Sequence, residues 1–183
     1  MEQRLEIRLS GSGGQGMILA GIILAEAAIL EGKNAIQSQS YGPEARGGAS
    51  KAEVIISNLE IDFPKVTKPD VLLALTDEAL SKYSGDLKSN GLIIIDTGMN
   101  EPETSHRVIR LPILETAQRE IGRSIVANIV ALGALVSATE AVSRASVETA
   151  VLGKVPKGTE DLNKKALHIG FELVQSSNAN KNL

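Results

Sequence analysis

The chain has 183 residues, an apolar fraction of 43% and a formal net charge of −3, with no cysteine and 2% aromatic residues. This length and composition predict one globular domain and argue against disorder, while the acidic balance argues against a nucleic-acid partner. The lack of cysteine excludes disulfides, thiolate zinc sites and cysteine-ligated iron–sulfur clusters within this chain. No apolar run reaches the roughly 18 residues of a membrane span and no signal-peptide core follows Met1, so we expect a cytoplasmic protein.

The first elements predicted are a strand, a glycine-rich turn and a helix. Apolar and charged residues alternate over residues 4–9, which predicts a strand near an edge of its sheet. The turn is Gly11-Ser12-Gly13-Gly14-Gln15-Gly16. The helix extends over residues 15–30 and stops at Gly32. Its expected core face consists of Ile18, Ile22, Ala25 and Ile29.

The middle of the chain reads mainly as strands. They are predicted at residues 34–40, 49–57, 71–75, 92–95 and 107–111, with a turn and a short strand at 58–63. The runs at 71–75 and 92–95 are continuously apolar, which is typical of strands buried on both faces of a parallel sheet. Between them, Thr76 can cap a helix that ends near Tyr83.

The last third is predicted to be helical, and residues 176–183 to form a disordered tail. The helices are expected at residues 113–122, 124–141, 146–152 and 160–175. Small residues in the second of these, such as Gly133, would allow close packing. Strands that alternate with helices predict an α/β fold. We expect a three-layer, Rossmann-like single domain over residues 1–175, with a mostly parallel sheet and helices on both faces.

The glycine turn has the spacing Gly11-x-Gly13-x-x-Gly16 between a strand and a helix. Glycines permit close backbone approach, and a helix start offers unpaired N–H groups to an anion such as phosphate. A dinucleotide site would also need an acidic residue at the end of the second strand, where residues 37–40 carry none. No Walker A lysine follows either. The alternative is that these glycines only shape a tight turn.

A second unusual segment is Ser40-Tyr41-Gly42-Pro43-Glu44-Ala45-Arg46-Gly47-Gly48. Its proline and glycines predict a constrained loop that carries the acid Glu44 and the base Arg46 close together. Alone, it could be a surface loop with a local ion pair of little energetic weight.

Together, the two segments resemble the gamma subunit, or gamma domain, of the 2-oxoacid:ferredoxin oxidoreductases. The stretches at residues 127–134 and 163–167 are similar to the same family and give weaker support, so the resemblance covers residues 5 to 175. A separate chain of this size is most similar to the 2-oxoglutarate type. Pyruvate, 2-oxoisovalerate and indolepyruvate types remain open.

The resemblance implies a non-redox subunit of an enzyme complex. Such a complex oxidatively decarboxylates a 2-oxoacid, forms an acyl-CoA and reduces ferredoxin, with thiamine diphosphate, Mg2+ and iron–sulfur clusters held by alpha, beta and in some cases delta partners. This chain alone would bind none of these cofactors, would be inactive, and could form a homodimer. No catalytic or metal-binding residue is assigned to it.

We expect the two loops to meet at the carboxyl edge of the sheet and to face the partners. The glycine turn would contact a phosphate of coenzyme A, and Arg46 would add positive charge. The binding residues expected are Gly11, Ser12, Gly13, Gly14, Gln15, Gly16, Tyr41, Glu44 and Arg46. Two alternatives stay open: a free-standing nucleotide- or dinucleotide-binding enzyme, and a purely structural assembly subunit.

Four other polar residues have structural or functional interpretations. Asp96 ends a buried strand, where an acid either takes part in function or caps the next turn. Asn128 sits in an apolar helix and is expected to bond a backbone carbonyl in the core. His106 and His168 lack partner motifs and are expected to be surface or structural residues.

Overall fold

The computed structural model describes residues 4–40 and 48–179. Its centre is a six-stranded sheet with the order β2-β3-β1-β4-β5-β6. The strands are β1 (Arg4–Ser12), β2 (Asn34–Gln39), β3 (Ala49–Ser57), β4 (Val71–Ala74), β5 (Leu92–Asp96) and β6 (Arg107–Leu111). The pairs β1–β4, β4–β5 and β5–β6 are parallel, whereas β3 is antiparallel to both β1 and β2. The prediction of a mostly parallel sheet is therefore confirmed.

The position predicted for the first strand is wrong, because β1 lies inside the sheet between β3 and β4. Two of the charged residues that suggested an edge, Glu6 and Arg8, are buried instead. Arg8 is 3% exposed and lies beside Glu53 of β3, with Arg8 Nη2 2.7 Å from Glu53 Oε1. A buried charge is tolerated when it is paired and hydrogen-bonded, so an alternating pattern does not by itself place a strand at an edge.

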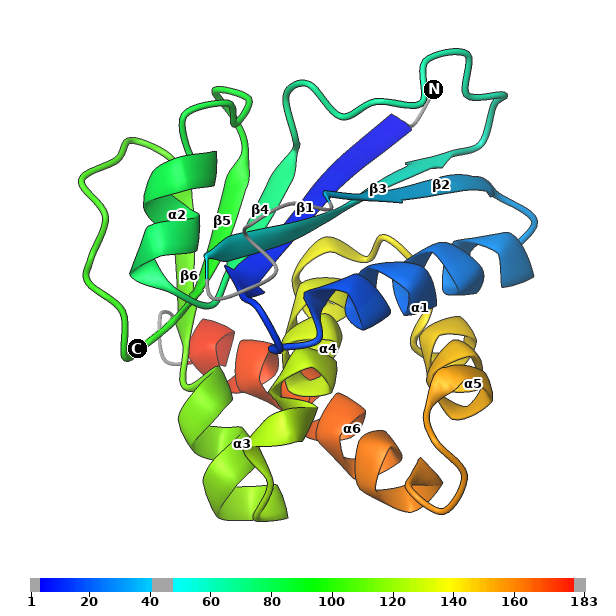
Figure 1. The fold of residues 1–183 in the computed structure, drawn as a ribbon, viewed down its shortest axis with the longest axis vertical. Coiled ribbons are helices and arrows are strands. Elements are labelled where there is room, and N and C mark those ends of the chain that lie inside the picture. Colours follow the sequence, from blue (N-terminus) through cyan, green and yellow to red (C-terminus); the bar gives the residue numbers. More distant parts are fainter. Residues whose placement is uncertain (1–3, 41–47, 180–183) are drawn as a thin grey trace.

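Helices cover both faces of the sheet, as predicted, but unequally (Figure 1). They are α1 (Met17–Leu30), α2 (Asp77–Tyr83), α3 (Ile113–Ile121), α4 (Ala127–Thr139), α5 (Arg144–Lys154) and α6 (Glu160–Ala179), with a short 3-10 helix, η2 (Ser124–Val126), before α4. The larger hydrophobic cluster joins the sheet to α1, α4, α5 and α6, and the smaller cluster joins it to α2.

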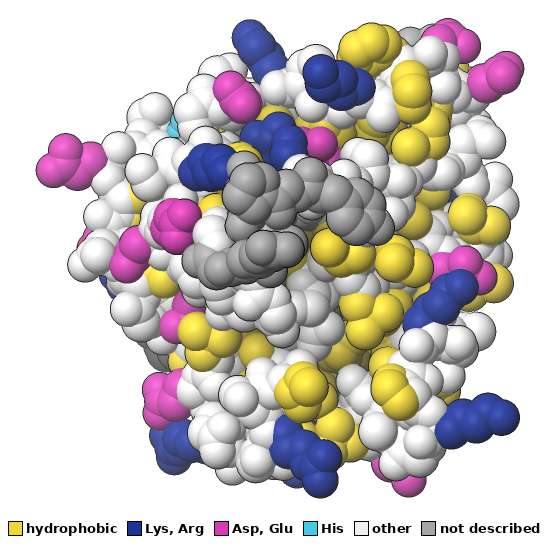
Figure 2. Space-filling model, in the orientation of Figure 1, with side chains coloured by type: hydrophobic (Ala, Val, Ile, Leu, Met, Phe, Trp, Pro, Cys, Tyr) yellow, Lys and Arg dark blue, Asp and Glu magenta, His cyan; other side chains and the backbone are white. Residues whose placement is uncertain are grey.

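Helix α1 presents a different face to the core from the one expected. Ile29 is 53% exposed and Ile18 and Ile22 are partly exposed, whereas the core-facing side consists largely of small residues. Gly21 sits so close to β3 that an added Cβ would lie 3.0 Å from the Cβ of Ala52. Because α1 is apolar on all sides, its sequence does not indicate which side packs on the sheet. Figure 2 shows hydrophobic side chains gathered in the region of α1.

Several helix boundaries follow the predicted signals. Thr76 Oγ1 accepts a hydrogen bond from the N–H of Ala79 at 3.2 Å and caps α2. Gly32 has φ +73° directly after α1, as a helix-stopping glycine does. The short strand expected at residues 58–63 does not form. Residues 176–179, expected in a disordered tail, continue α6, and residues 180–183 lie outside the described part.

Helices α4 and α6 pack closely through glycines. A Cβ at Gly133 of α4 would overlap the backbone oxygen of Leu167, and a Cβ at Gly170 of α6 would overlap that of Val130. The small residues predicted to allow close packing thus do so. The helix predicted over residues 124–141 begins as the 3-10 helix η2, in which Ile125 is 76% exposed. Within residues 4–40 and 48–179, no helix is long and apolar enough to cross a membrane.

Candidate functional site

The glycine motif lies at the carboxyl edge of the sheet, where β1 ends and α1 begins (Figure 1). Gly11 and Ser12 still belong to β1 and pair with Ser50 and Ala49 of β3. The turn itself therefore consists of residues 13–16. Ligands of open α/β sheets bind beyond the carboxyl ends of the strands, so the turn is placed where a ligand is expected.

The turn is closed by its own glutamine. Gln15 Oε1 accepts a hydrogen bond from the N–H of Ser12 at 2.8 Å, and the N–H of Gln15 donates to the carbonyl oxygen of Ser12 at 3.2 Å. A Cβ at Gly11 would overlap Gln15 Oε1, so a side chain there would displace the glutamine from the turn. Ser50 Oγ also donates to the carbonyl oxygen of Gly11 at 3.2 Å. These bonds hold the turn in one shape before any ligand binds.

Helix α4 contacts the glycine turn through Asn128. Asn128 is 5% exposed, and its Nδ2 donates to the carbonyl oxygen of Gly16 at 3.2 Å. This confirms the prediction that Asn128 bonds a backbone carbonyl. Gly16 has φ +75° and is the N-cap of α1 without a side-chain cap. The start of α1 is thus fixed by a residue far along the chain.

Backbone donors of the turn are available to a ligand. In the described part of the chain, no group accepts a hydrogen bond from the N–H of Gly13, Gly14 or Gly16. The first turn of α1 contains no acidic residue. Gly14 has φ +90°, and a Cβ there would meet nothing within 4 Å, so its backbone faces open space. Unpaired N–H groups at a helix start attract anions, phosphate among them.

The second predicted loop lies almost entirely outside the described residues. Tyr41, Glu44 and Arg46 therefore cannot be placed, and their assignment stays a prediction. The strands on either side of this loop are placed: Ala49, at the start of β3, pairs with Ser12, and Gln39, at the end of β2, pairs with Ala52. The two ends of the loop thus lie at the same edge of the sheet as the glycine turn.

The glycine turn separates two hollows in the surface. One, of about 440 Å³, extends along α1 past Ile18 and Ile22 to Ser50. The other, of about 370 Å³, lies between the turn, the start of α4 and the start of α6, and Arg123 lines it. Arg123 could not be recognised from the sequence, because it is isolated there; the contact of α4 with the glycine turn brings it to this hollow.

The topology does not suit a dinucleotide. Such a site takes its ribose-binding acid from the strand that follows the glycine turn and lies beside β1. Here β3 separates β2 from β1, and β2 is an edge strand whose last residues carry no carboxylate. The structure therefore gives no support to the dinucleotide alternative.

Asp96 and both histidines have structural partners. Asp96 Oδ1 accepts from the N–H of Gly98 at 2.7 Å, and Oδ2 accepts from the N–H of Leu114 at 2.8 Å, so this acid caps both the turn and α3. His106 Nδ1 lies 2.7 Å from Thr104 Oγ1, and His168 Nε2 bonds Glu148 on the surface. These contacts support the structural interpretations.

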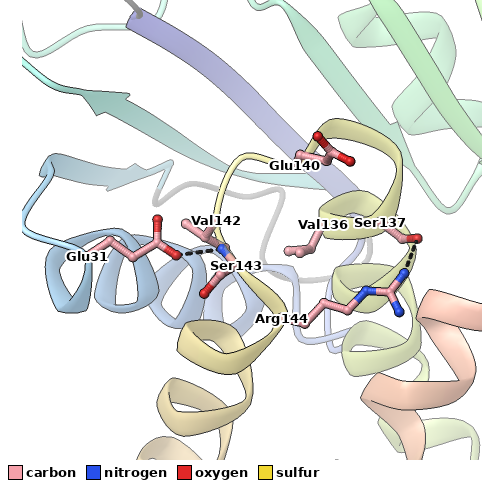
Figure 3. Close-up of a pocket in the computed structure, with 7 residues that line it drawn as sticks. All are labelled: Glu31, Val136, Ser137, Glu140, Val142, Ser143 and Arg144. Carbon is pink, nitrogen blue, oxygen red and sulfur yellow. Dashed lines mark hydrogen bonds between the residues drawn. The ribbon is translucent and has the colours of Figure 1, made fainter.

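A third cavity, of about 710 Å³, lies at the opposite end of α1 (Figure 3). Glu31 Oε1 accepts from the N–H of Ser143 at 2.5 Å, and Glu31 Oε2 lies 2.8 Å from Lys33 Nζ. Burial raises the pKa of Glu31, but the hydrogen bonds from Lys33 and Ser143 outweigh it and hold this pKa at about 2. The carboxylate of Glu31 thus ties the end of α1 to the start of α5.

Across residues 4–40 and 48–179, no group of three acidic or histidine side chains is placed to hold a metal ion. The whole sequence contains no cysteine. The residues of this chain therefore do not fit a cysteine-ligated iron–sulfur cluster. The glycine turn, in contrast, fits a phosphate.

Comparison with known proteins adds a family to this geometry. The family model described as pyruvate ferredoxin/flavodoxin oxidoreductase matches residues 6–173. The 2-oxoglutarate synthase subunit KorC of Methanocaldococcus jannaschii is 51% identical over 180 residues, with 96% of this chain and 96% of that protein covered.

Two solved structures resemble the fold. The gamma subunit of keto/oxoacid ferredoxin oxidoreductase from Geobacter sulfurreducens has a TM-score of 0.88 and 51% identity, over 96% of this chain and 98% of that one. The 2-oxoglutarate:ferredoxin oxidoreductase from Magnetococcus marinus, solved with 2-oxoglutarate, coenzyme A and succinyl-CoA bound, has a TM-score of 0.84 and 24% identity, over 95% of this chain and 31% of that one. At this lower identity the similarity shows the fold alone, here as one part of a longer chain.

Proposed function

The chain belongs to the pyruvate ferredoxin/flavodoxin oxidoreductase family, and from this premise we propose that it is the gamma subunit of a 2-oxoglutarate:ferredoxin oxidoreductase. The complex would decarboxylate 2-oxoglutarate oxidatively, form succinyl-CoA and pass the electrons to ferredoxin. The observation that supports 2-oxoglutarate as the substrate is the 51% identity to a 2-oxoglutarate synthase subunit along nearly the whole of both chains.

The division of labour in the complex follows from what this chain contains. Alpha- and beta-type subunits, with a delta subunit in some complexes, would hold thiamine diphosphate, Mg2+ and the iron–sulfur clusters, which supply the decarboxylation and electron-transfer chemistry. This subunit has no cysteine to ligate a cluster. Its own contribution is to bind and orient coenzyme A.

We place a phosphate of coenzyme A at the glycine turn. The N–H groups of Gly13, Gly14 and Gly16, from which no described residue accepts a hydrogen bond, support this placement, as does the absence of acidic residues from the first turn of α1. Gln15 and Asn128 would act as positioning residues, because their side chains form hydrogen bonds with the backbone of the turn. A site that is already shaped loses less conformational entropy on binding. Tyr41, Glu44 and Arg46 are proposed to complete it.

The partner subunits are proposed to cover the exposed side of α1. Ile29 and Leu30 are 53% and 52% exposed, and this side adjoins the apolar hollow beside the glycine turn. Apolar surface of this kind is typical of subunit interfaces. The same surface would allow the isolated chain to form a homodimer. Ile29→Lys together with Leu30→Lys should abolish a dimer in light scattering and weaken co-purification with the partners.

The substrate assignment is tested with the assembled complex. The chain is co-expressed with its alpha- and beta-type partners, and ferredoxin reduction is followed with 2-oxoglutarate, pyruvate or 2-oxoisovalerate. We expect 2-oxoglutarate to give the highest kcat/KM and activity to require coenzyme A. A higher kcat/KM for pyruvate or 2-oxoisovalerate would overturn the assignment of 2-oxoglutarate as the substrate.

The phosphate site is tested with variants of Gly14, where a side chain meets open space. Gly14→Asp places a negative charge on the turn, and Gly14→Asn is its neutral match, since both residues tolerate a left-handed backbone. We expect Gly14→Asp to raise the KM for coenzyme A at least about tenfold above that of Gly14→Asn, with the KM for 2-oxoglutarate unchanged. Gly32→Asp, at the far end of α1, controls for added charge. Equal KM values for the two Gly14 variants would place the phosphate elsewhere.

A further inference from the structure

The 710 Å³ cavity at the end of α1 is separate from the glycine turn, which lies where the same helix begins (Figure 3). It is bounded by the end of α1, the end of α4 and the start of α5. Its volume lies within the range of known ligand sites. Val136 and Val142, which are 2% and 3% exposed, form an apolar part of its wall. The cavity therefore suits a small molecule with an apolar portion.

Arg144 is held in position in this cavity without an acidic partner. The central carbon of its guanidinium lies 4.8 Å from the centre of the Phe171 ring, and its Nη2 donates to Ser137 Oγ at 3.3 Å. Ser137 Oγ in turn donates to the carbonyl oxygen of Phe171 at 3.2 Å. Among the described residues, no carboxylate forms an ion pair with Arg144. A guanidinium that is already oriented and unpaired suits a carboxylate, because its fork of N–H groups matches the two oxygens.

Glu140 brings a negative charge to the same cavity. It caps the end of α4 with φ +52°, and no other non-glycine residue in the described part of the chain has a positive φ. This backbone conformation is unusual for a glutamate, and residues held in such conformations cluster at functional sites. Its carboxylate forms no ion pair with any described residue. Arg144 does not neutralise it, because that side chain is directed to Ser137 (Figure 3).

The third charged residue of the cavity wall, Glu31, is already paired. Glu31 Oε2 lies 2.8 Å from Lys33 Nζ, and Glu31 Oε1 accepts from the N–H of Ser143 at 2.5 Å. Among the described residues of the wall, Arg144 and Glu140 are therefore the two opposite charges that remain for a ligand. A ligand with a single charge would neutralise only one of them. A zwitterion satisfies both, because each of its ends forms a charge-assisted hydrogen bond.

We propose that this cavity binds an α-amino acid with an aliphatic side chain. The Arg144 guanidinium donates to the carboxylate of the amino acid, and the ammonium group of the amino acid donates to the Glu140 carboxylate. The aliphatic side chain packs against Val136 and Val142. None of these four residues belongs to the glycine turn, so binding here does not depend on the proposed site for coenzyme A.

The charges of the ligand are tested on the full chain by NMR titration with three probes of similar size. L-Leucine carries both charges, 2-hydroxy-4-methylpentanoate has a hydroxyl in place of the ammonium group, and L-leucinamide has an amide in place of the carboxylate. We expect leucine to bind about tenfold more tightly than either analogue, because each analogue loses one charge-assisted contact. The amide shifts should change around Val142 and not at the glycine turn. No binding of leucine, or equal affinity for the three probes, would overturn the proposal.

Variants of the two charged residues assign each contact. Arg144→Gln should weaken the binding of leucine and of the hydroxy acid about tenfold and leave that of leucinamide unchanged. Glu140→Gln should weaken the binding of leucine and of leucinamide and leave that of the hydroxy acid unchanged. Glu115→Gln and Arg119→Gln, which alter an exposed ion pair on α3, are the matched controls and should change none of the three affinities. A uniform loss for all three probes in either cavity variant would overturn the assigned contacts.

Discussion

Asn128 in α4 donates a hydrogen bond from Nδ2 to the carbonyl oxygen of Gly16, 112 residues earlier, at 3.2 Å. Gly16 allows this approach because it has no side chain: a Cβ there would lie 2.5 Å from the same Nδ2. The pair fixes the start of α1 against α4. The shape of the glycine turn therefore depends on the long-range packing of the domain as well as on its local sequence.

Gly16→Ala should destabilise the protein more than Gly32→Ala does. Both glycines have a left-handed backbone, which costs roughly 1–2 kcal/mol for alanine, but a Cβ at Gly32 meets nothing within 4 Å. At Gly16 the methyl group also displaces Asn128 and breaks its hydrogen bond, which adds about 1 kcal/mol or more. Urea unfolding of both variants measures the difference. If Gly16→Ala and Gly32→Ala lowered the free energy of unfolding equally, the contact with Asn128 would not stabilise the turn.

The glycines between α4 and α6 should be far less tolerant than the glycine in α5. Gly133→Ala and Gly170→Ala each push a methyl group into the backbone of the facing helix, and we expect losses above about 2 kcal/mol. Gly153→Ala meets nothing within 4 Å and should stabilise by up to about 1 kcal/mol, because alanine favours helix. Thermal and urea unfolding rank the three variants by stability. If Gly133→Ala left the free energy of unfolding unchanged, the close contact between α4 and α6 would not contribute to stability.

The parts of the fold that could be predicted are those with strong local signals. The continuous apolar runs gave β4 and β5, Thr76 gave the start of α2, and Gly32 gave the end of α1. The side of α1 that faces the core could not be predicted, because the helix is apolar all round and small residues decide how closely it packs. Ile29 was therefore placed on the wrong side.

The candidate site was only half visible in the sequence. The glycine turn is one continuous motif, so its spacing and its position after a strand indicated an anion site. Arg123 comes from a segment more than a hundred residues away, and it belongs to no motif that would mark a ligand contact. It lies near the turn because α4 packs beside α1. Such a residue becomes visible only once the tertiary structure is known.

Removing only one member of the buried ion pair Arg8–Glu53 should destabilise the protein more than replacing both. Arg8 and Glu53 are 3% and 7% exposed, and Arg8 Nε donates to Glu53 Oε1 at 2.8 Å. Among the described residues, Arg8→Met leaves the buried Glu53 carboxylate with Lys51 as its remaining ion-pair partner, and we expect a loss of about 3–5 kcal/mol in the free energy of unfolding. Replacing both residues with methionine should cost less than this. A double-mutant cycle in urea measures the coupling, and Arg119→Met on the surface should have no measurable effect.

Glu31 should make the stability depend on pH in the acid range. Burial raises the pKa of Glu31, but hydrogen bonds from Lys33 and Ser143 outweigh it and hold this pKa at about 2, below its ordinary value of 4.5. Because the folded pKa is the lower one, the stabilisation is present above about pH 4.5 and is lost as pH falls towards 2. Glu31→Gln should therefore cost at most about 3 kcal/mol at neutral pH, and the cost should disappear near pH 2. Urea unfolding at a series of pH values measures this, with Glu60→Gln, at an exposed position, as the control. A cost at Glu31 that stays constant from pH 7 to pH 2 would show that its charge does not hold α1 to α5.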